Sequence, residues 1–393
     1  MKTIFNIALI AAIGGAGGCV GFEEQLPPAW EGDGLPPQVD LCQGCLEGQE
    51  LRGELMLLVN TKLTDGDTNF TANFPLDAEG RYVGNAMYLY DPERACPDGG
   101  SGCRLAKLGN LWLNETMGPI SMGDQSLLRF SVRDLAWHPT KGLWGLSYDP
   151  LNDEWGITTL GVPDWTRSDN RIESVRYAFR YGDVNDPATD ACYWRQSMTG
   201  LEFVGDALLA GSAGKPGNGL DARGAVFRLD PAFVDGPTHC VLPTDISQDP
   251  LYYACAPVCS VHALFDEKLG VSGDLAGAPG GDVLALVRGE MSDTFPAGRH
   301  ELFRVAATGD APTPASYGPF VEGVMAGDEI EGMARIRGTL YAVGIGGTIY
   351  KITEPTPEAP TTWRFEVHDE IGALFTDPER SLRLRGATAV TVP

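Results

Sequence analysis

The sequence has few basic residues, and its body has no long apolar run. Its 393 residues include 29 Lys and Arg against 53 Asp and Glu, which gives a formal net charge of -24 at pH 7. A surface of this charge repels the phosphates of nucleic acids, so we expect no nucleic-acid partner. After the N-terminal segment there is no apolar stretch of the length that spans a membrane as a helix. These properties favour a soluble, extracytoplasmic folded body.

The sequence also lacks the short motifs that mark many enzyme sites. It contains no Gly-x-Ser-x-Gly nucleophile elbow, no phosphate-binding Gly-rich loop and no His-Glu-x-x-His motif. Candidate functional residues must therefore be found from the fold and from scattered side chains.

The N-terminus reads as an export signal. Lys2 is followed by an apolar stretch from Ile4 to Ile13, and small residues then lead to Cys19. The stretch is too short to span a membrane, and small residues before a cleavage site are typical of a signal peptide. Ala16-Gly17-Gly18-Cys19 resembles a bacterial lipobox, with Ala16 in place of the usual Leu. The resemblance implies cleavage before Cys19 and lipid acylation of that residue. An ordinary secretory signal with an incidental cysteine is the alternative.

Lipidation of Cys19 would make the membrane a partner, since several acyl chains on one residue anchor a protein stably. Among the lipoproteins that this segment resembles, an Asp after the cysteine implies retention at the inner membrane. Val20 stands there instead, which favours the outer membrane, at its periplasmic face or at the cell surface. Residues 20–50 contain two Pro-Pro pairs and several acids, a composition typical of an extended tether. We therefore predict a signal peptide over 1–18, a lipidated tether over 19–50 and one folded domain over 51–393.

The sequence contains nine cysteines. Setting Cys19 aside leaves an even number in an oxidising compartment, which favours disulfides. The predicted pairs are Cys42–Cys45, Cys96–Cys103, Cys192–Cys240 and Cys255–Cys259. The alternative for the first and last of these pairs is a shared zinc site with four thiolate ligands.

A repeated pattern of short strands predicts the fold. In the segment from Ile330 to Thr353, three apolar runs with β-forming residues are separated by Gly-containing turns, and residues 361–369 supply a fourth. Similar units recur upstream, with leading strands near Val132, Thr199 and Val261, roughly 65 residues apart. Repeats of four antiparallel strands are the blades of a β-propeller.

The two ends of the domain complete the pattern. The last residues read as the first strand of a blade without its followers, and residues 54–113 read as a blade without its first strand. Joining them closes the ring and removes exposed sheet edges. We predict an all-β propeller with five four-stranded blades. Six or seven blades, or a pair of β-sandwiches, are the alternatives.

The stretches "GMARIRGTLYAVG" and "GLEFVGDALLAG" look like the inner-strand pairs of gluconolactonase-like, phytase-like and related propellers. This resemblance to an architecture implies a site at one mouth of the central channel. The candidate residues are Glu331, Glu202 and Asp134, which lie on or beside expected inner strands. Gathered acids bind hard cations such as Ca2+, and gluconolactonase-like propellers hold a channel cation. The alternative is that these acids are solvated strand ends.

A second candidate for calcium is the stretch "TDGDTN", in which Asp65, Asp67 and Asn69 present oxygens at alternate positions. Phe70 and Leu76 stand where an EF-hand needs Gly and Glu, so this is not an EF-hand. An acidic hairpin turn is the simpler interpretation.

The N-terminal export and lipidation signal and the strand repeats, together with the lack of a catalytic motif, favour a binding or scaffold module for an envelope protein or glycan. The alternative is a cation-dependent hydrolase of the gluconolactonase-like or phytase-like type. A fold alone does not decide between them, because propellers carry many functions.

Overall fold

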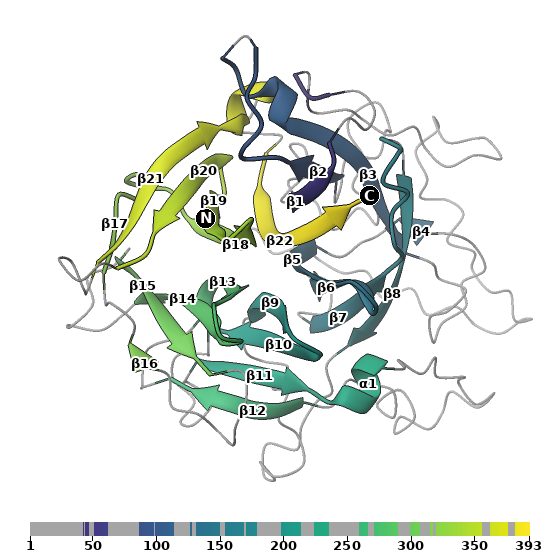
Figure 1. Ribbon diagram of the computed structural model, residues 1–393. Coiled ribbons are helices and arrows are strands. Elements are labelled where there is room, and N and C mark those ends of the chain that lie inside the picture. Colours follow the sequence, from purple (N-terminus) through teal and green to yellow (C-terminus); the bar gives the residue numbers. More distant parts are fainter. Residues whose placement is uncertain are drawn as a thin grey trace, which may run out of the picture.

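The structure is a computed structural model of the whole chain. It describes residues 42, 44–46, 51–61, 86–97, 99–113, 126–127, 131–149, 154–168, 170–178, 198–213, 224–235, 259–265, 271–289, 299–306, 315–316, 320–355, 362–375 and 382–393. The predicted β-propeller is confirmed: five blades surround a central axis (Figure 1).

The first two blades join into one sheet. Blade 1, from the inside outward, consists of β22 (Leu384–Val392), β1 (Gly53–Asn60), β2 (Ala86–Tyr90) and β3 (Leu105–Leu113). Blade 2 consists of β5 (Ser131–His138), β6 (Gly142–Asp149), β7 (Glu154–Leu160) and β8 (Asn170–Ala178). The outer strands β3 and β8 pair in parallel, and the short β4 (Ser126–Leu127) pairs with β3. A short 3-10 helix, η3 (Gly102–Arg104), precedes β3.

The other three blades are separate sheets. Blade 3 consists of β9 (Met198–Val204), β10 (Ala207–Ser212), β11 (Ala225–Leu229) and β12 (Cys259–Leu264), with α1 (Pro231–Asp235) after β11. Blade 4 consists of β13 (Val271–Gly277), β14 (Val283–Gly289), β15 (Arg299–Val305) and β16 (Ala315–Ser316). Blade 5 consists of β18 (Ile330–Ile336), β19 (Thr339–Gly344), β20 (Thr348–Thr353), β21 (Thr362–Glu370) and the short β17 (Phe320–Glu322). The 3-10 helix η7 (Ile371–Leu374) follows β21.

Strands from both ends of the chain close the ring, as predicted. The last strand, β22, pairs antiparallel with β1 from Gly53↔Val392 to Asn60↔Leu384. It is the innermost strand of blade 1, so the first and the last of the described strands lie in one sheet (Figure 1).

The core consists of five apolar clusters, each between two neighbouring blades. Strand β14 shows why, since successive side chains of a strand point to opposite faces. Val283, Ala285 and Val287 pack against blade 3, whereas Leu284 and Leu286 pack against blade 5. Because both faces of a blade are buried, its strands are continuous apolar runs. This explains why they were visible in the sequence.

One predicted blade boundary is wrong. Val261 lies in β12, the outermost strand of blade 3, and blade 4 begins at β13. The run "VHALF" has the apolar content expected of an inner strand, whereas the true inner strand "VSGDLAG" contains two glycines and an acid.

The end of the predicted tether contacts the propeller. Cys42 forms a β-bridge with Phe375, and Leu46 forms one with Ala106. Cys42 is buried in the cluster between blades 5 and 1. No helix within the described ranges is long and apolar enough to cross a membrane.

Two predicted disulfides, Cys42–Cys45 and Cys96–Cys103, are present in the structure. Cys259 is also disulfide-bonded, and its predicted partner Cys255 lies outside the described residues. The predicted pair Cys192–Cys240, the lipidation site Cys19 and the calcium candidates Asp65, Asp67 and Asn69 lie outside them too.

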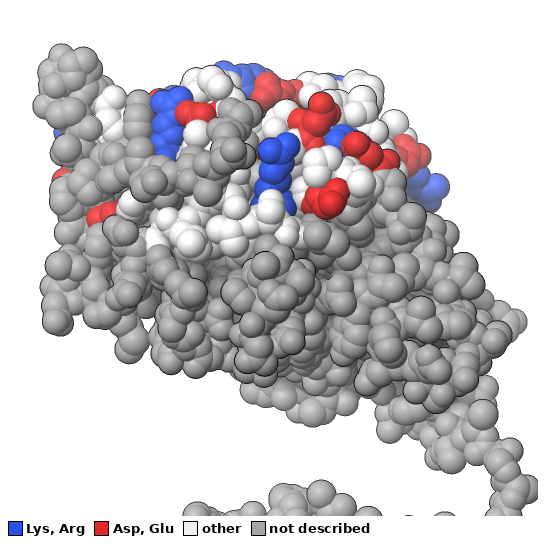
Figure 2. Space-filling model, turned by 90° about the horizontal axis from the view of Figure 1, so that it is seen from below, with Lys and Arg blue, Asp and Glu red and all other residues white. Residues whose placement is uncertain are grey.

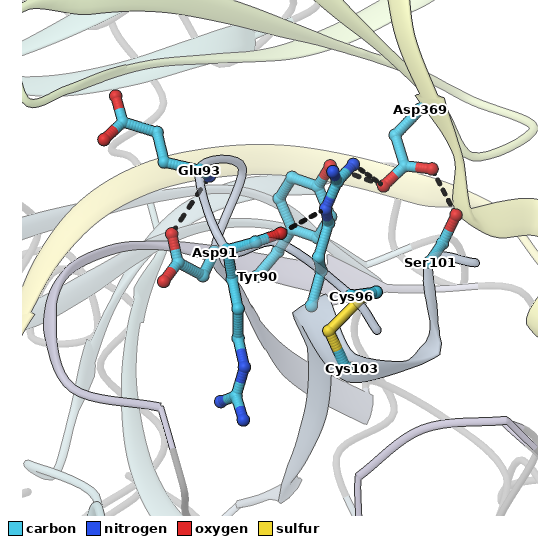
Figure 3. Close-up of a disulfide and its surroundings, with 9 residues drawn as sticks. Tyr90, Asp91, Glu93, Cys96, Ser101, Cys103 and Asp369 are labelled. Atoms are coloured by element: carbon cyan, nitrogen blue, oxygen red, sulfur yellow. Dashed lines mark hydrogen bonds and ion pairs between the residues drawn. A yellow bond between two sulfur atoms is a disulfide. The ribbon is translucent and has the colours of Figure 1, made fainter. Parts of the chain in front are cut away.

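A polar cluster around Asp369 joins the last blade to the first (Figure 3). Asp369, near the end of β21, accepts hydrogen bonds from the hydroxyls of Tyr90 (2.8 Å) and Ser101 and from Arg104 (3.0 Å). Ser101 and Arg104 belong to the β2–β3 connection, which the Cys96–Cys103 disulfide closes. Burial alone would raise the pKa of Asp369, but these three hydrogen bonds, with a fourth from the backbone N–H of Glu370, outweigh it and lower the pKa.

We expect Asp369→Asn to lower the free energy of unfolding by about 1–3 kcal/mol at pH 7, because a charged acceptor with three side-chain donors is lost. An acid whose pKa is lowered by folding stabilises the protein above its unfolded pKa. The difference from the wild type should therefore shrink below about pH 4. Urea unfolding at pH 7 and below about pH 4 measures the difference in the free energy of unfolding between the variant and the wild type. Glu366→Gln, at an exposed position of β21, is the matched control. An equal loss there would contradict a stabilising role of the Asp369 hydrogen bonds.

Candidate functional site on the axis

The five inner strands line the axis in a shared register. At one equivalent position stand Asp134, Gly200, Asp274, Gly332 and Gly386. The next residue of each strand (Leu135, Leu201, Leu275, Met333 and Ala387) packs into a different one of the five core clusters. The strands therefore run in the same direction, and all begin at one end of the axis, here called the entry end.

The two aspartates of this ring bind backbone. Asp134 accepts a hydrogen bond from its neighbour Leu135 (2.8 Å) and another from Leu201 of the next blade. Asp274 repeats the arrangement with Leu275 and Met333 of the next blade, both at 2.6 Å. Each carboxyl group thus links two adjacent inner strands.

The ring glycines allow the backbones themselves to approach. Gly386 has φ +67, and a Cβ on it would lie 2.4 Å from the Cα of Asp134. A Cβ on Gly200 would lie 2.9 Å from the backbone nitrogen of Leu275. Side chains larger than hydrogen do not fit at these positions without moving a strand.

Asp134 and Asp274 also interact with each other. Burial, with only partial compensation from hydrogen bonds, raises the pKa of Asp134 to about 8. Burial and the charge of Asp134 raise the pKa of Asp274. Like charges in a buried site cannot both ionise easily, so the pair shares a proton near neutral pH. Burial, followed by the charge of Asp274, raises the pKa of Glu202 as well.

The three acids predicted from the sequence have three different settings. Asp134 is occupied by two backbone N–H groups, and Glu202 accepts from the N–H of Gly277 at 3.2 Å. Glu331 forms an ion pair with Arg385 at 2.9 Å. No three acidic, histidine or cysteine side chains of the described residues come together as metal ligands. These acids therefore do not fit a shared calcium site.

Basic side chains gather at the entry end. Arg133 and Arg385 stand one residue before the ring position on β5 and β22, Glu331 stands at the same level on β18, and Arg383 precedes β22. We call these four residues the entry cluster. Burial, followed by the charge of Arg385, lowers the pKa of Arg133 to about 9. Burial raises the pKa of Glu331, and the nearby arginines oppose this effect.

Two aromatic side chains adjoin the entry cluster. The guanidinium carbon of Arg133 lies 5.5 Å from the centroid of the Tyr148 ring, and the rings of Tyr148 and Trp155 lie 4.9 Å apart. Both aromatic residues are half-buried. By contrast, Trp165 packs edge-on against Trp137 beside the core between blades 1 and 2.

The turns at the other end of the inner strands carry matched charges. Lys141 pairs with Asp235 at 2.6 Å, and Arg335 pairs with Glu354 at 2.9 Å. The part of the surface described in Figure 2 likewise shows acidic and basic residues interspersed.

The sequence reasoning missed Asp274 and all three arginines. A signal for Asp274 was present, because the tripeptide Asp-Leu-Ala occurs at 134–136 and again at 274–276. Aligning these copies would have placed Asp274 on an inner strand. The arginines had no signal of their own, since each becomes visible as part of a group only when the ring is assembled.

No protein-family model matches this sequence, and no curated protein matches it.

We expect Gly386→Ala to lower the free energy of unfolding by about 2 kcal/mol or more, because the new Cβ is strained and meets the Asp134 backbone. Gly346→Ala is the matched control, since its Cβ meets nothing within 4 Å. Urea unfolding measures both. A similar loss of unfolding free energy in the two variants would show that a side chain is tolerated at Gly386 as well as at Gly346.

The aspartate pair should make folding depend on pH. The folded pair retains a proton that an unfolded Asp releases near about pH 4, so the free energy of unfolding should fall as the pH rises from about 4 to about 8. Asp274→Asn removes this titration and one acceptor of backbone N–H. Its cost should be about 1–3 kcal/mol at about pH 5 and should shrink towards about pH 8. Urea unfolding at both pH values tests this, and a cost that does not change with pH would refute proton sharing.

Proposed function

We propose that the protein is a binding module of the bacterial cell envelope, anchored by lipid on Cys19, that holds an envelope protein or glycan at the entry end of its propeller. The observation that carries the proposal is that the acids near the axis have hydrogen-bond or ion-pair partners, whereas, within the described part of the chain, two arginines at the entry end have donors without one. The acids that a hydrolase would use are engaged with backbone N–H groups or with an arginine. In the entry cluster, by contrast, the Nε atoms of Arg133 and Arg383 have no hydrogen-bond partner among the described residues.

Two further observations support export and anchoring. The disulfides Cys42–Cys45 and Cys96–Cys103 suit an oxidising compartment. If Cys19 is acylated, the residues between it and Cys42 span at most about 75 Å when fully extended. That length keeps the propeller within reach of the outer membrane surface, on its periplasmic face or outside.

The test places a photoreactive residue at either end of one inner strand. Thr199 lies at the entry end of β9, and Asp206 lies in the exposed turn at its other end. Irradiation of intact cells should give one discrete covalent adduct from position 199 and none from position 206. Cys19→Ala should move the protein out of the membrane fraction and abolish the adduct.

Two results would count against the proposal. Adducts of equal yield from both positions would place no ligand at the entry end. Stoichiometric calcium in the purified protein, together with a melting temperature lowered by a chelator, would favour the cation-dependent hydrolase.

A further inference from the structure

We propose that the entry cluster recognises an acidic sugar, with the carboxylate of a uronate unit bound by the arginines and its ring packed beside Tyr148. This inference rests on the proposed function and names the ligand of the same site. Arg133 belongs to both parts of this site, because it interacts with the other charges of the entry cluster and with the Tyr148 ring.

The entry cluster attracts an anionic group of a ligand. The charged groups that act on Glu331 are Arg385, Arg133, Glu329 and Arg383. Within the four residues of the cluster, three guanidinium groups face one carboxylate, and a carboxylate of the ligand would reduce this excess.

Arg133 and Arg383 each retain a hydrogen-bond donor that no described residue accepts. The Nε atoms of Arg133 and Arg383 are buried and have no hydrogen-bond partner among the described residues. The backbone of Arg383 is fixed, because its N–H donates to Asn60 and its carbonyl accepts from Thr61. Planar guanidinium groups with free N–H donors match the geometry of a carboxylate.

The aromatic pair supplies the surface for the sugar ring. Tyr148 and Trp155 are half-buried, so each keeps part of its surface for a ligand. Ligand sites combine aromatic surface with a few charged groups that fix orientation. A uronate carries both complements in one unit: an apolar ring face and one carboxylate.

Burial, followed by the charge of Arg385, disfavours the charged form of Arg133. A carboxylate bound beside Arg133 would oppose this effect. Arg133 is therefore the residue whose replacement tests the inference most directly.

The experiment is calorimetric titration of the detergent-solubilised full-length protein. The probes are an aldobiouronate (a disaccharide of one uronate and one neutral sugar), its carboxyl-reduced neutral form, acetate and inorganic phosphate. We expect the aldobiouronate to bind at least about 10-fold more tightly than each of the other three. Arg133→Gln should weaken binding at least about 10-fold without lowering the melting temperature. Lys141→Gln, in the turn at the far end of β5, should bind as the wild type does.

Several results would overturn the inference: no binding of the aldobiouronate, equal binding of acetate or phosphate, or unchanged affinity in Arg133→Gln. If that variant fails to fold, Arg383→Gln provides the same test. The photochemical adduct from position 199 is independent of these titrations. An adduct without uronate binding would refute the sugar and leave the binding module in place.

Discussion

Every blade of this propeller buries both of its faces, and the ring must therefore close for any blade to be fully packed. Closure is achieved by β22, which carries the C-terminal residues into the sheet that β1 begins. The cluster between blades 5 and 1 contains residues from both ends of the chain, including Met56 and Ala387. The Asp369 hydrogen bonds and the docked Cys42 reinforce the same junction. The junction that is most remote in sequence is thus held by contacts beyond its apolar cluster.

Closure also determines what the buried charges do. Five strands in one register bring five backbones close together on the axis, and side chains there must be absent or hydrogen-bonded. Gly386 and Gly200 satisfy the first condition, and Asp134 and Asp274 satisfy the second. Carboxyl groups that would suggest catalysis in another setting are here part of the packing. Their raised pKa values follow from burial and mutual repulsion, and structural groups show such shifts as well as catalytic ones do.

The extent to which the sequence predicted this structure follows from the range of the interactions involved. The blades were predictable because buried strands leave continuous apolar runs and Gly-containing turns, both of which are local. Ring closure was predictable because incomplete units stood at both ends of the domain. The predicted start of blade 4 at Val261 was wrong because the inner strand β13 is poor in apolar residues. The glycines and the aspartate of β13 contact neighbouring blades, and these contacts are not visible in the sequence of the strand itself. The entry cluster was not predictable for the same reason: Arg133 and Arg385 are about 250 residues apart and meet only across the closed ring.

A basic cluster within a chain of net charge -24 has a physical consequence for selectivity. The long-range field repels anions, and salt screens that field over about 8–10 Å. The partly buried arginines are screened much less than the surface acids, so a local site can outweigh the global repulsion at close contact. Under this balance a ligand with one anionic group beside neutral, ring-shaped surface is favoured over a densely charged polymer. A uronate placed among neutral sugars has this distribution of charge, whereas a nucleic acid does not.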